Sequence, residues 1–265
     1  MSTTNTKGTA LITGASTGIG AVYADRLAKR GHDLILVARD EARLNALAER
    51  LRGQTGVKVE VIKADLTDKA DLLKIEQRLA TDAAITALVN NAGVAGANDF
   101  VATDPDAFEK MIQLNVTAVT RLAAAAARNF VPRDKGTIIN LASVVGLIPE
   151  LGMPVYGATK ALGEDLARLE HDDVIVARVA SLFGVAGASG KGGNFVETML
   201  RLAKEKGRLT VVADQVMSPT ASLDAGEAIL DLVAAKASAG DYHVVNSGIA
   251  SWCAFADAII ARAGV

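Results

Sequence analysis

The sequence predicts an α/β protein with a doubly wound parallel sheet and a small C-terminal lobe. Three observations carry this prediction: short continuous apolar runs, amphipathic stretches of helical period between most of them, and the absence of a linker or long internal repeat. Of the 265 residues 50% are apolar, so the chain can bury a core as one domain over residues 1–265.

The expected strands are β-branched runs that lack the alternation of a half-exposed strand. They lie at Ala10–Thr13, Leu34–Ala38, Val57–Ile62, Ala87–Val89, Thr137–Ala142, Val174–Ala180, Leu209–Val212 and Tyr242–Val245. Helical spacing between strands is clearest at Leu44, Leu47 and Leu51, and at Leu72, Ile75 and Leu79. The patch GASGKGG at 187–193 is predicted to be a loop. Parallel strands joined by right-handed crossovers place ligands at their carboxyl ends.

Charge and cysteine content exclude several classes of partner. A formal net charge of -2 without long runs of like charge gives no reason to expect nucleic acid or an anionic membrane. The single cysteine, Cys253, cannot form an internal disulfide, and no residues cluster around it in the sequence as metal ligands would. The start MSTTNTKG lacks an apolar signal segment and no stretch is apolar enough to span a membrane, so we expect a cytoplasmic protein without a metal.

The stretch TGASTGIG, residues 13–20, follows the first expected strand and opens the first expected helix. Glycines at 14, 18 and 20 allow a tight turn and a close approach of the backbone to a pyrophosphate. The amides and dipole of a helix start favour that negative charge. The stretch therefore predicts a nucleotide-binding turn, although a glycine-rich turn alone could be a simple connection between strand and helix.

Further motifs follow in order: residues 90–93 (NNAG) after the fourth strand, Asn115 in a later helix, Ser143 after the fifth strand, and Tyr156 with Lys160. Together with the glycine spacing, they make the first 160 or so residues resemble the NADP-dependent, single-domain branch of the short-chain dehydrogenase/reductase superfamily. The resemblance implies a Rossmann-type sheet, a nicotinamide dinucleotide and hydride transfer between a carbonyl and an alcohol.

The chemistry of carbonyl reduction assigns roles to these residues. The developing alkoxide needs a proton, and the Tyr156 hydroxyl is the expected acid. A free tyrosine has a pKa of about 10, and the charge of Lys160, one helical turn away, is expected to favour the ionised form. Ser143 is expected to donate a second hydrogen bond to the substrate oxygen. The resemblance implies that Lys160 also holds the nicotinamide ribose and that Asn115 fixes a water that relays protons to it.

The residue after the second strand bears on the choice of cofactor. Where a relative that prefers NAD carries an acidic residue, this chain has Ala38 and then Arg39, whose guanidinium suits a 2′-phosphate. NADPH is therefore expected over NADH, although Asp40 is adjacent. The expected cofactor-binding residues are Gly14, Ser16, Thr17, Gly18, Ile19, Gly20, Arg39, Asp65, Leu66, Asn91, Ala92, Gly93, Tyr156 and Lys160.

Residues from about 160 to 262 resemble a different branch, the reductases that convert dTDP-4-dehydrorhamnose to dTDP-rhamnose. The matching pieces are Arg178–Gly184, Asn194–Val196, Thr198–Lys206, Asp214-Gln215, Ser218–Thr220, Tyr242–Gly248 and Ser251-Trp252. The chain departs from that branch at Met217, where those reductases carry a small residue, and Trp252 is expected to anchor helix packing. YGATKALGE fits both branches, so the sequence indicates a recombined chain, either engineered or a natural mosaic.

Three functions stay open. The first is an NADP-dependent oxidoreductase acting on a carbonyl or alcohol, and the second is a reductase of a 4-keto nucleotide sugar. The third is a chimeric scaffold that binds the dinucleotide with little turnover. We expect a homodimer or homotetramer, because the alanine-rich face at 122–127 allows close helix contact, and we expect the Tyr156 helix to end near Glu170.

Overall fold

The computed structural model describes residues 7–95, 100–143, 154–170, 174–179, 181–184 and 194–265. The glycine-rich loop predicted at 187–193 lies outside the described residues. Contacts divide the chain into two compact units, Met1–Val174 and Ile175–Val265, and each is described by itself.

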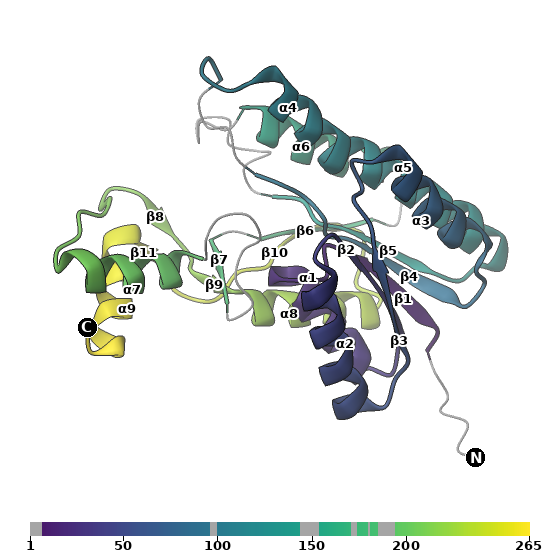
Figure 1. The fold of residues 1–265 in the computed structure, drawn as a ribbon, viewed down its shortest axis with the longest axis horizontal. Helices are drawn as coiled ribbons and strands as arrows, with labels where there is room; N and C mark the ends of the chain where they lie inside the picture. The colour runs from purple at the N-terminus through teal and green to yellow at the C-terminus, as the bar shows by residue number, and fades with distance from the viewer. Residues whose placement is uncertain (1–6, 96–99, 144–153, 171–173, 180, 185–193) are drawn as a thin grey trace. The chain divides into compact units, whose positions relative to one another are not determined.

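The first unit is built on a parallel sheet of β1 (Thr9–Thr13), β2 (Asp33–Ala38), β3 (Val59–Lys63), β4 (Ile85–Asn90) and β5 (Thr137–Asn140). Its strand order is β3-β2-β1-β4-β5 (Figure 1). The central strands are almost entirely buried, as their continuous apolar runs predict. The predicted α/β class with a parallel sheet is confirmed.

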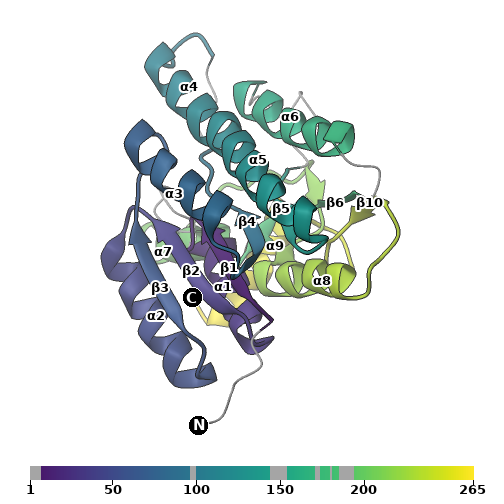
Figure 2. The same cartoon turned by 90° about the vertical axis from the view of Figure 1, so that its right-hand side faces the viewer.

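Helices cover both faces of this sheet. Figures 1 and 2 show α1 and α2 on one face, and α3 and α5 on the other. The helices of the unit are α1 (Gly18–Lys29), α2 (Glu41–Thr55), α3 (Lys69–Thr81), α4 (Pro105–Ile112), the π-helix η1 (Gln113–Ala118), α5 (Val119–Phe130), the 3-10 turn η2 (Val131–Arg133) and α6 (Pro154–Glu170). The leucine and isoleucine sets predicted for α2 and α3 are buried, and α6 ends at Glu170 as expected.

Part of the alanine-rich face of α5 packs inside the unit. Leu122, Ala125 and Ala126 are at most 1% exposed and belong to the same core as Leu79 of α3 and Leu88 of β4. Small side chains there let α3 and α5 approach closely. The face expected to meet a second copy is therefore used in part by the core of the chain itself.

The register of the strands brings their carboxyl ends to one edge. Thr13 of β1 pairs with Val37 of β2, Ile12 with Val89 of β4, and Asn90 with Asn140 of β5. The loops after β1, β2, β4 and β5 leave the sheet at this edge, which is where the candidate site residues of the first unit gather.

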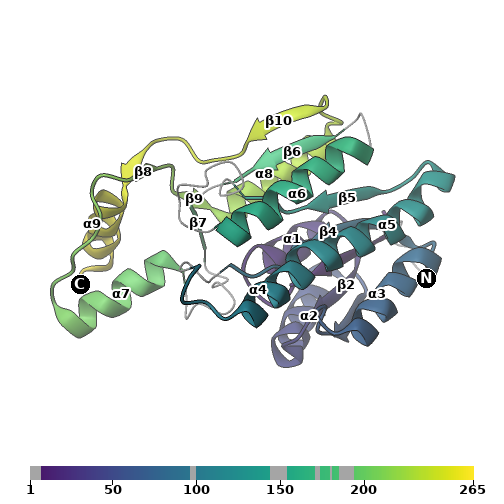
Figure 3. The ribbon, with the colours of Figure 1, turned by 90° about the horizontal axis from the view of Figure 1, so that it is seen from above.

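The second unit contains short strand pairs and helices (Figure 3). Its elements are β6 (Ile175–Arg178), β7 (Leu182–Phe183), α7 (Phe195–Lys206), β8 (Val216–Met217), β9 (Thr220–Ala221), α8 (Ser222–Ala234), β10 (Gly240–His243), β11 (Ala250–Ser251) and α9 (Trp252–Ala263). The pairs β6 with β10 and β7 with β9 are parallel, and β8 with β11 is antiparallel.

The strand predicted at Leu209–Val212 is wrong. After α7 ends at the left-handed residue Gly207, this segment is irregular, and the carbonyl of Val212 accepts a hydrogen bond from the amide of Cys253. The segment thus packs against the start of α9, and no strand ladder forms there among the described residues. A short β-branched run fits either arrangement, so the sequence did not separate them.

Aromatic rings join α7 to α9. The ring of Phe195 lies 4.6 Å from that of Trp252 and 5.7 Å from that of Phe255, and Phe183 lies 5.3 Å from Phe255. Such ring pairs contribute about 0.5–1.5 kcal/mol each beyond the area that they bury. The predicted packing role of Trp252 is confirmed.

Tyr23 of α1 provides a test of this fold. Its side chain is 0% exposed, its hydroxyl has no hydrogen-bond partner among the described residues, and burial raises its pKa. A buried hydroxyl without a partner costs about 1–3 kcal/mol of desolvation. We therefore expect Tyr23→Phe to leave the free energy of unfolding unchanged or to raise it by about 1 kcal/mol, as measured by urea denaturation.

A matched control is Tyr242→Phe, because the Tyr242 hydroxyl donates to the carbonyl of Ser238 at 2.8 Å. That variant should lose roughly 0.5 kcal/mol. A loss greater than about 1 kcal/mol in Tyr23→Phe would show that its hydroxyl has a partner.

Candidate active site

The glycine-rich turn joins β1 to α1 and packs against the loop that follows β4. Gly14 and Gly18 have φ angles of +65° and +57°, in the left-handed region that favours glycine. A Cβ on Gly14 would lie 2.7 Å from the Asn91 side-chain nitrogen, and one on Gly20 would overlap the same side chain and the Gly14 carbonyl. Two of the three glycines therefore interlock with Asn91.

The start of α1 leaves amide groups open. Thr17, the N-cap residue, makes no side-chain cap, and no acidic residue lies in the first turn. In contrast, α2 and α3 are capped by the side chains of Asp40 and Asp68. Uncapped amides and a helix dipole without a nearby carboxylate favour an anion. The turn thus fits the pyrophosphate of a dinucleotide.

Thr13 holds the two loops together. Its buried hydroxyl donates to the carbonyl of Val89 and accepts from the amides of Asn91 and Ala92, both at 3.0 Å. The Asn91 side chain in turn donates to the carbonyls of Thr13 at 3.0 Å and Gly14 at 3.1 Å. Residues 91–93, which were predicted to bind the cofactor, are thereby fixed beside the glycine-rich turn.

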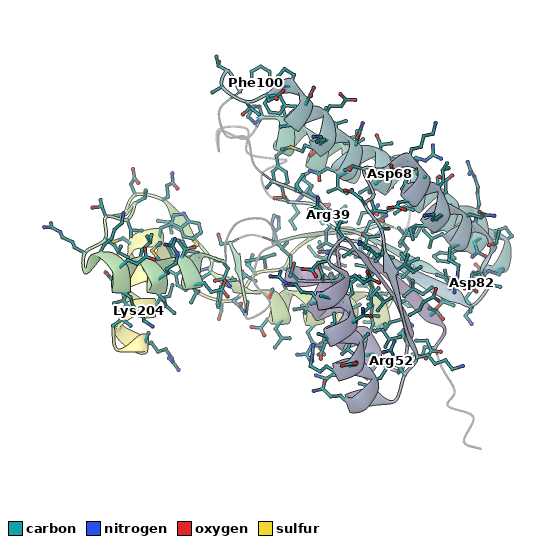
Figure 4. The ribbon with its side chains drawn as sticks, viewed as in Figure 1. Arg39, Arg52, Asp68, Asp82, Phe100 and Lys204 are labelled. Atoms are coloured by element: carbon teal, nitrogen blue, oxygen red, sulfur yellow. The ribbon has the colours of Figure 1, made fainter. Side chains whose placement is uncertain are left out.

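Arg39 directly follows β2 (Figure 4), and Asp65 lies two residues after the end of β3. The Arg39 side chain is 72% exposed, and its guanidinium lies 4.0 Å from the Asp65 carboxylate. One oxygen of Asp65 accepts hydrogen bonds from the amide and the hydroxyl of Thr67. The side chain of Leu66, the residue between these two, is buried. The Arg39 side chain is therefore accessible to a ligand anion.

The carboxylate of Asp40 is engaged by Arg43. One oxygen of its carboxylate accepts from the amide of Arg43 at 3.0 Å, and the other pairs with the Arg43 side chain at 3.3 Å. Its role as the cap of α2 accounts for its position next to Arg39.

Asn115 lies in the π-helix η1 and is 3% exposed. Its amide nitrogen donates to the carbonyl of Val94 at 2.9 Å and to the hydroxyl of Thr159 at 3.2 Å, and its oxygen accepts from the amide of Val94 at 3.0 Å. Both donors of the side chain are thus used by the protein. The side chain of Asn115 ties the loop after β4 to α6.

Tyr156, Ser143 and Lys160 come together as expected. A hydrogen bond with Ser143 acts on the Tyr156 hydroxyl, and the Lys160 amine lies 5.9 Å from the centre of the Tyr156 ring. The amine donates to the carbonyl of Leu141 at 2.9 Å. A Cβ on Gly93 would lie 3.4 Å from this amine, so a small residue at 93 allows the loop to approach it.

The effect expected of Lys160 on Tyr156 is not what the structure shows. Burial raises the pKa of Tyr156, and the hydrogen bond from Ser143 lowers it by less. Burial also lowers the pKa of Lys160 to about 8. Desolvation dominates at both groups because burial disfavours the charged form of each.

Three residues of this network carried no predicted role. Thr13 and Thr159 place hydroxyls between loops, and Asn140 accepts from the Asn90 side chain at 2.9 Å across β4 and β5. Their positions next to predicted motifs are the only signal in the sequence, because their partners lie up to 79 residues away.

Other kinds of site find no support in the described part of the chain. It contains no group of three or more His, Cys, Asp or Glu side chains that could hold a metal ion. None of its helices has the length and apolar character needed to cross a bilayer.

Comparison with protein families gives two overlapping matches. Residues 8–181 match the family described as short chain dehydrogenase, and residues 151–265 match the RmlD substrate binding domain. Both matches include Tyr156 and Lys160. The two predicted resemblances, with a change near residue 160, are confirmed.

Individual relatives repeat this division. A very-long-chain 3-oxoacyl-CoA reductase of Anas platyrhynchos is 32% identical over 166 residues, which cover 61% of this chain and 53% of that protein. The spore coat polysaccharide biosynthesis protein SpsK of Bacillus subtilis is 45% identical over 111 residues, which cover 42% of this chain and 37% of that protein. The chain thus spans about half or less of the length of these curated relatives.

Solved structures match along nearly the whole chain. A short-chain dehydrogenase from Sphingobium yanoikuyae in complex with NADPH is 40% identical with a TM-score of 0.74, covering 97% of this chain and 94% of that one. The bulky-bulky ketone specific alcohol dehydrogenase from Comamonas testosteroni is 35% identical with a TM-score of 0.73, covering 97% and 92%.

The burial of Lys160 gives a test of the electrostatics. Because its pKa is about 8 in the folded chain and 10.5 when unperturbed, the unfolded state binds more protons between these values. The wild type therefore gains stability as pH rises through this window. We expect Lys160→Met to be about 1–2 kcal/mol more stable than wild type at pH 7, after the loss of the bond to Leu141 is included.

This advantage should shrink as pH rises from about 8 to 10.5. Denaturation at several pH values measures it, with Lys204→Met, at an exposed position on α7, as the control that shows no such trend. A Lys160→Met protein that is less stable than wild type at pH 7 would contradict this account.

Proposed function

Because the chain belongs to the short-chain dehydrogenase family, we propose that it is an oxidoreductase that transfers a hydride between NADPH and a carbonyl or alcohol. The observation that carries this proposal is the hydrogen bond between Ser143 and Tyr156 beside the buried amine of Lys160. A hydroxyl acid, a second donor bonded to it and a nearby amine form a site for protonating an oxygen whose carbon receives a hydride.

NADPH supplies the hydride in this chemistry. Tyr156 donates its proton to the substrate oxygen during reduction, and Ser143 donates a second hydrogen bond that stabilises the developing charge. Lys160 replaces the proton of Tyr156 and holds the ribose. Asn115 acts by fixing the loop after β4 against α6, since its side-chain donors are both engaged.

The raised pKa of Tyr156 bears on the direction of the reaction. At neutral pH the hydroxyl keeps its proton and is ready to give it to a carbonyl oxygen. Alcohol oxidation needs the phenolate as base, so its rate should rise with pH above neutrality. Near pH 7 Tyr156 is thus in the protonated form that carbonyl reduction requires.

The residues of the first unit fit the dinucleotide. The uncapped start of α1 would receive the pyrophosphate, and residues 91–93 would lie along the nicotinamide side. The exposed guanidinium of Arg39 would pair with the 2′-phosphate. Asp65, with one oxygen bound to Thr67 and the other 4.0 Å from Arg39, would lie beside the adenine.

A second candidate is the reduction of a 4-keto nucleotide sugar. The specific observation in its favour is the match of residues 151–265 to the RmlD substrate binding domain, together with the 45% identity to SpsK. Met217, which replaces a small residue of that branch, weighs against it. The proposal has three further parts. The chain is a recombination of two branches, it assembles as a dimer or tetramer, and it is located in the cytoplasm.

The first test is Tyr156→Phe in an activity screen with NADPH over ketones, aldehydes and dTDP-4-keto sugars side by side. Loss of the acid should lower kcat about 10²–10⁴-fold, while NADPH fluorescence titration should show retained binding. Turnover of the dTDP-sugar alone would favour the second candidate. NADPH binding without turnover in either protein would favour a scaffold and overturn the proposal.

The second test addresses the cofactor. Arg39→Ala should weaken NADPH binding by about 1.5–3 kcal/mol, roughly tenfold to a hundredfold, because a charge-assisted contact to the 2′-phosphate is lost. Affinity for NADH should change little. Titration of both cofactors into both proteins measures the preference.

Asp40→Asn is the matched control for Arg39→Ala. Asparagine caps a helix as well as aspartate, so α2 keeps its cap while the charge next to Arg39 is removed. The ratio of the two affinities should stay near that of the wild type. An unchanged ratio in Arg39→Ala, or a changed one in Asp40→Asn, would refute the assignment.

A further inference from the structure

The hydroxyl of Thr159 lies between the residues of the proposed active site. Thr159 is 4% exposed, donates to the backbone carbonyl of Tyr156 at 2.7 Å and accepts from the Asn115 side chain at 3.2 Å. It is adjacent to Lys160 in the sequence. The hydroxyl thus joins the turn of α6 that carries Tyr156 and Lys160 to the π-helix η1.

This arrangement differs from an ordinary threonine in a helix. Thr55 and Thr81 also bond to the preceding turn, to the carbonyls of Leu51 at 2.7 Å and Gln77 at 2.8 Å. Those bonds stay within one helix and run to the residue four positions earlier. Thr159 bonds to the residue three positions earlier and joins two helices.

The hydrogen-bond inventory leaves little freedom in this link. Thr159 has one hydroxyl proton, which goes to Tyr156, so it can only accept from Asn115. The second donor and the oxygen of the Asn115 amide are bound to the backbone of Val94. A continuous chain of bonds therefore runs from Val94 through Asn115 and Thr159 to Tyr156.

We propose that Thr159 is a positioning residue that sets the place of Tyr156 and Lys160 relative to the loop after β4. This inference rests on the proposed function. In it, Thr159 aligns the Tyr156 hydroxyl and the Lys160 amine with the loop after β4, beside which the nicotinamide would lie. Without the hydroxyl, the Asn115 donor and the Tyr156 carbonyl lose a buried partner, and α6 can shift against η1. A displacement of about 1 Å can lower the rate on the order of a hundredfold.

Kinetics test the proposal with Thr159→Val, which keeps the shape but lacks the hydroxyl, and with Thr159→Ser, which keeps the hydroxyl. We expect Thr159→Val to lower kcat about tenfold or more, with the KM for NADPH within about twofold of wild type. Thr159→Ser should restore kcat to within about twofold. Thr55→Val, which removes a bond within one helix, should leave kcat unchanged, and Thr159→Ala serves as a second hydroxyl-free variant if Thr159→Val does not fold.

Wild-type kcat in Thr159→Val would overturn the proposal. A loss of kcat that serine does not restore, or an equal rise in the KM for NADPH, would also overturn it, because each indicates a general structural defect. In an Asn115→Ala background, Thr159→Val should lower kcat little further, because both residues act through one chain of hydrogen bonds.

Hydrogen exchange decides the proposal independently of turnover. Thr159→Val should lose amide protection in η1 and the turn at 156–160, with little change in α3, whereas Thr159→Ser should match wild type. Unchanged protection in Thr159→Val would overturn the inference. If the wild-type protein turns over no substrate, the proposed function fails, and this measurement still shows whether Thr159 joins the two helices.

Discussion

The bonds of the Thr13 hydroxyl are the constraint on which the candidate site depends. One side chain at the end of β1 holds the backbone of the loop after β4, and the Asn91 side chain returns two bonds to the glycine-rich turn. A parallel sheet brings the ends of β1 and β4 together but does not by itself fix the loops that leave them. The Thr13 hydroxyl fixes these loops. A residue larger than glycine does not fit at 14 or 20, because the Asn91 side chain fills the space beside them.

Burial sets the chemistry of the second half of the site. Lys160 is 8% exposed, and its amine donates to the backbone carbonyl of Leu141. Such an environment disfavours charge on the amine and on the Tyr156 hydroxyl alike. The site therefore holds a neutral tyrosine close to a lysine whose pKa is lowered. This arrangement suits proton transfer and lowers the stability of the folded chain.

The sequence predicted the frame of this site better than its connections. Strand runs, helix periods and the spacing of Tyr156 and Lys160 are local patterns, and the structure has them where they were expected. The hydroxyl of Thr159 finds its partner 44 residues away, and no local pattern encodes such a pair. The direction of the Tyr156 pKa also escaped prediction, because the spacing of two residues reveals their distance but not their exclusion from water. At Leu209–Val212, an apolar run too short to show its period was assigned to a strand.

The hydrogen bonds of Tyr156, Lys160, Asn115 and Thr159 described above are made within residues 1–174. Their partners come from η1, α6 and the loops after β4 and β5, and these elements precede the second unit in the chain. The match to the RmlD substrate binding domain begins at residue 151 and so shares only α6 with this network. The two family matches overlap across α6, so the helix that carries Tyr156 and Lys160 is common to both. The bonds that hold the acid and the amine are thus made by residues that the match to the short chain dehydrogenase family includes.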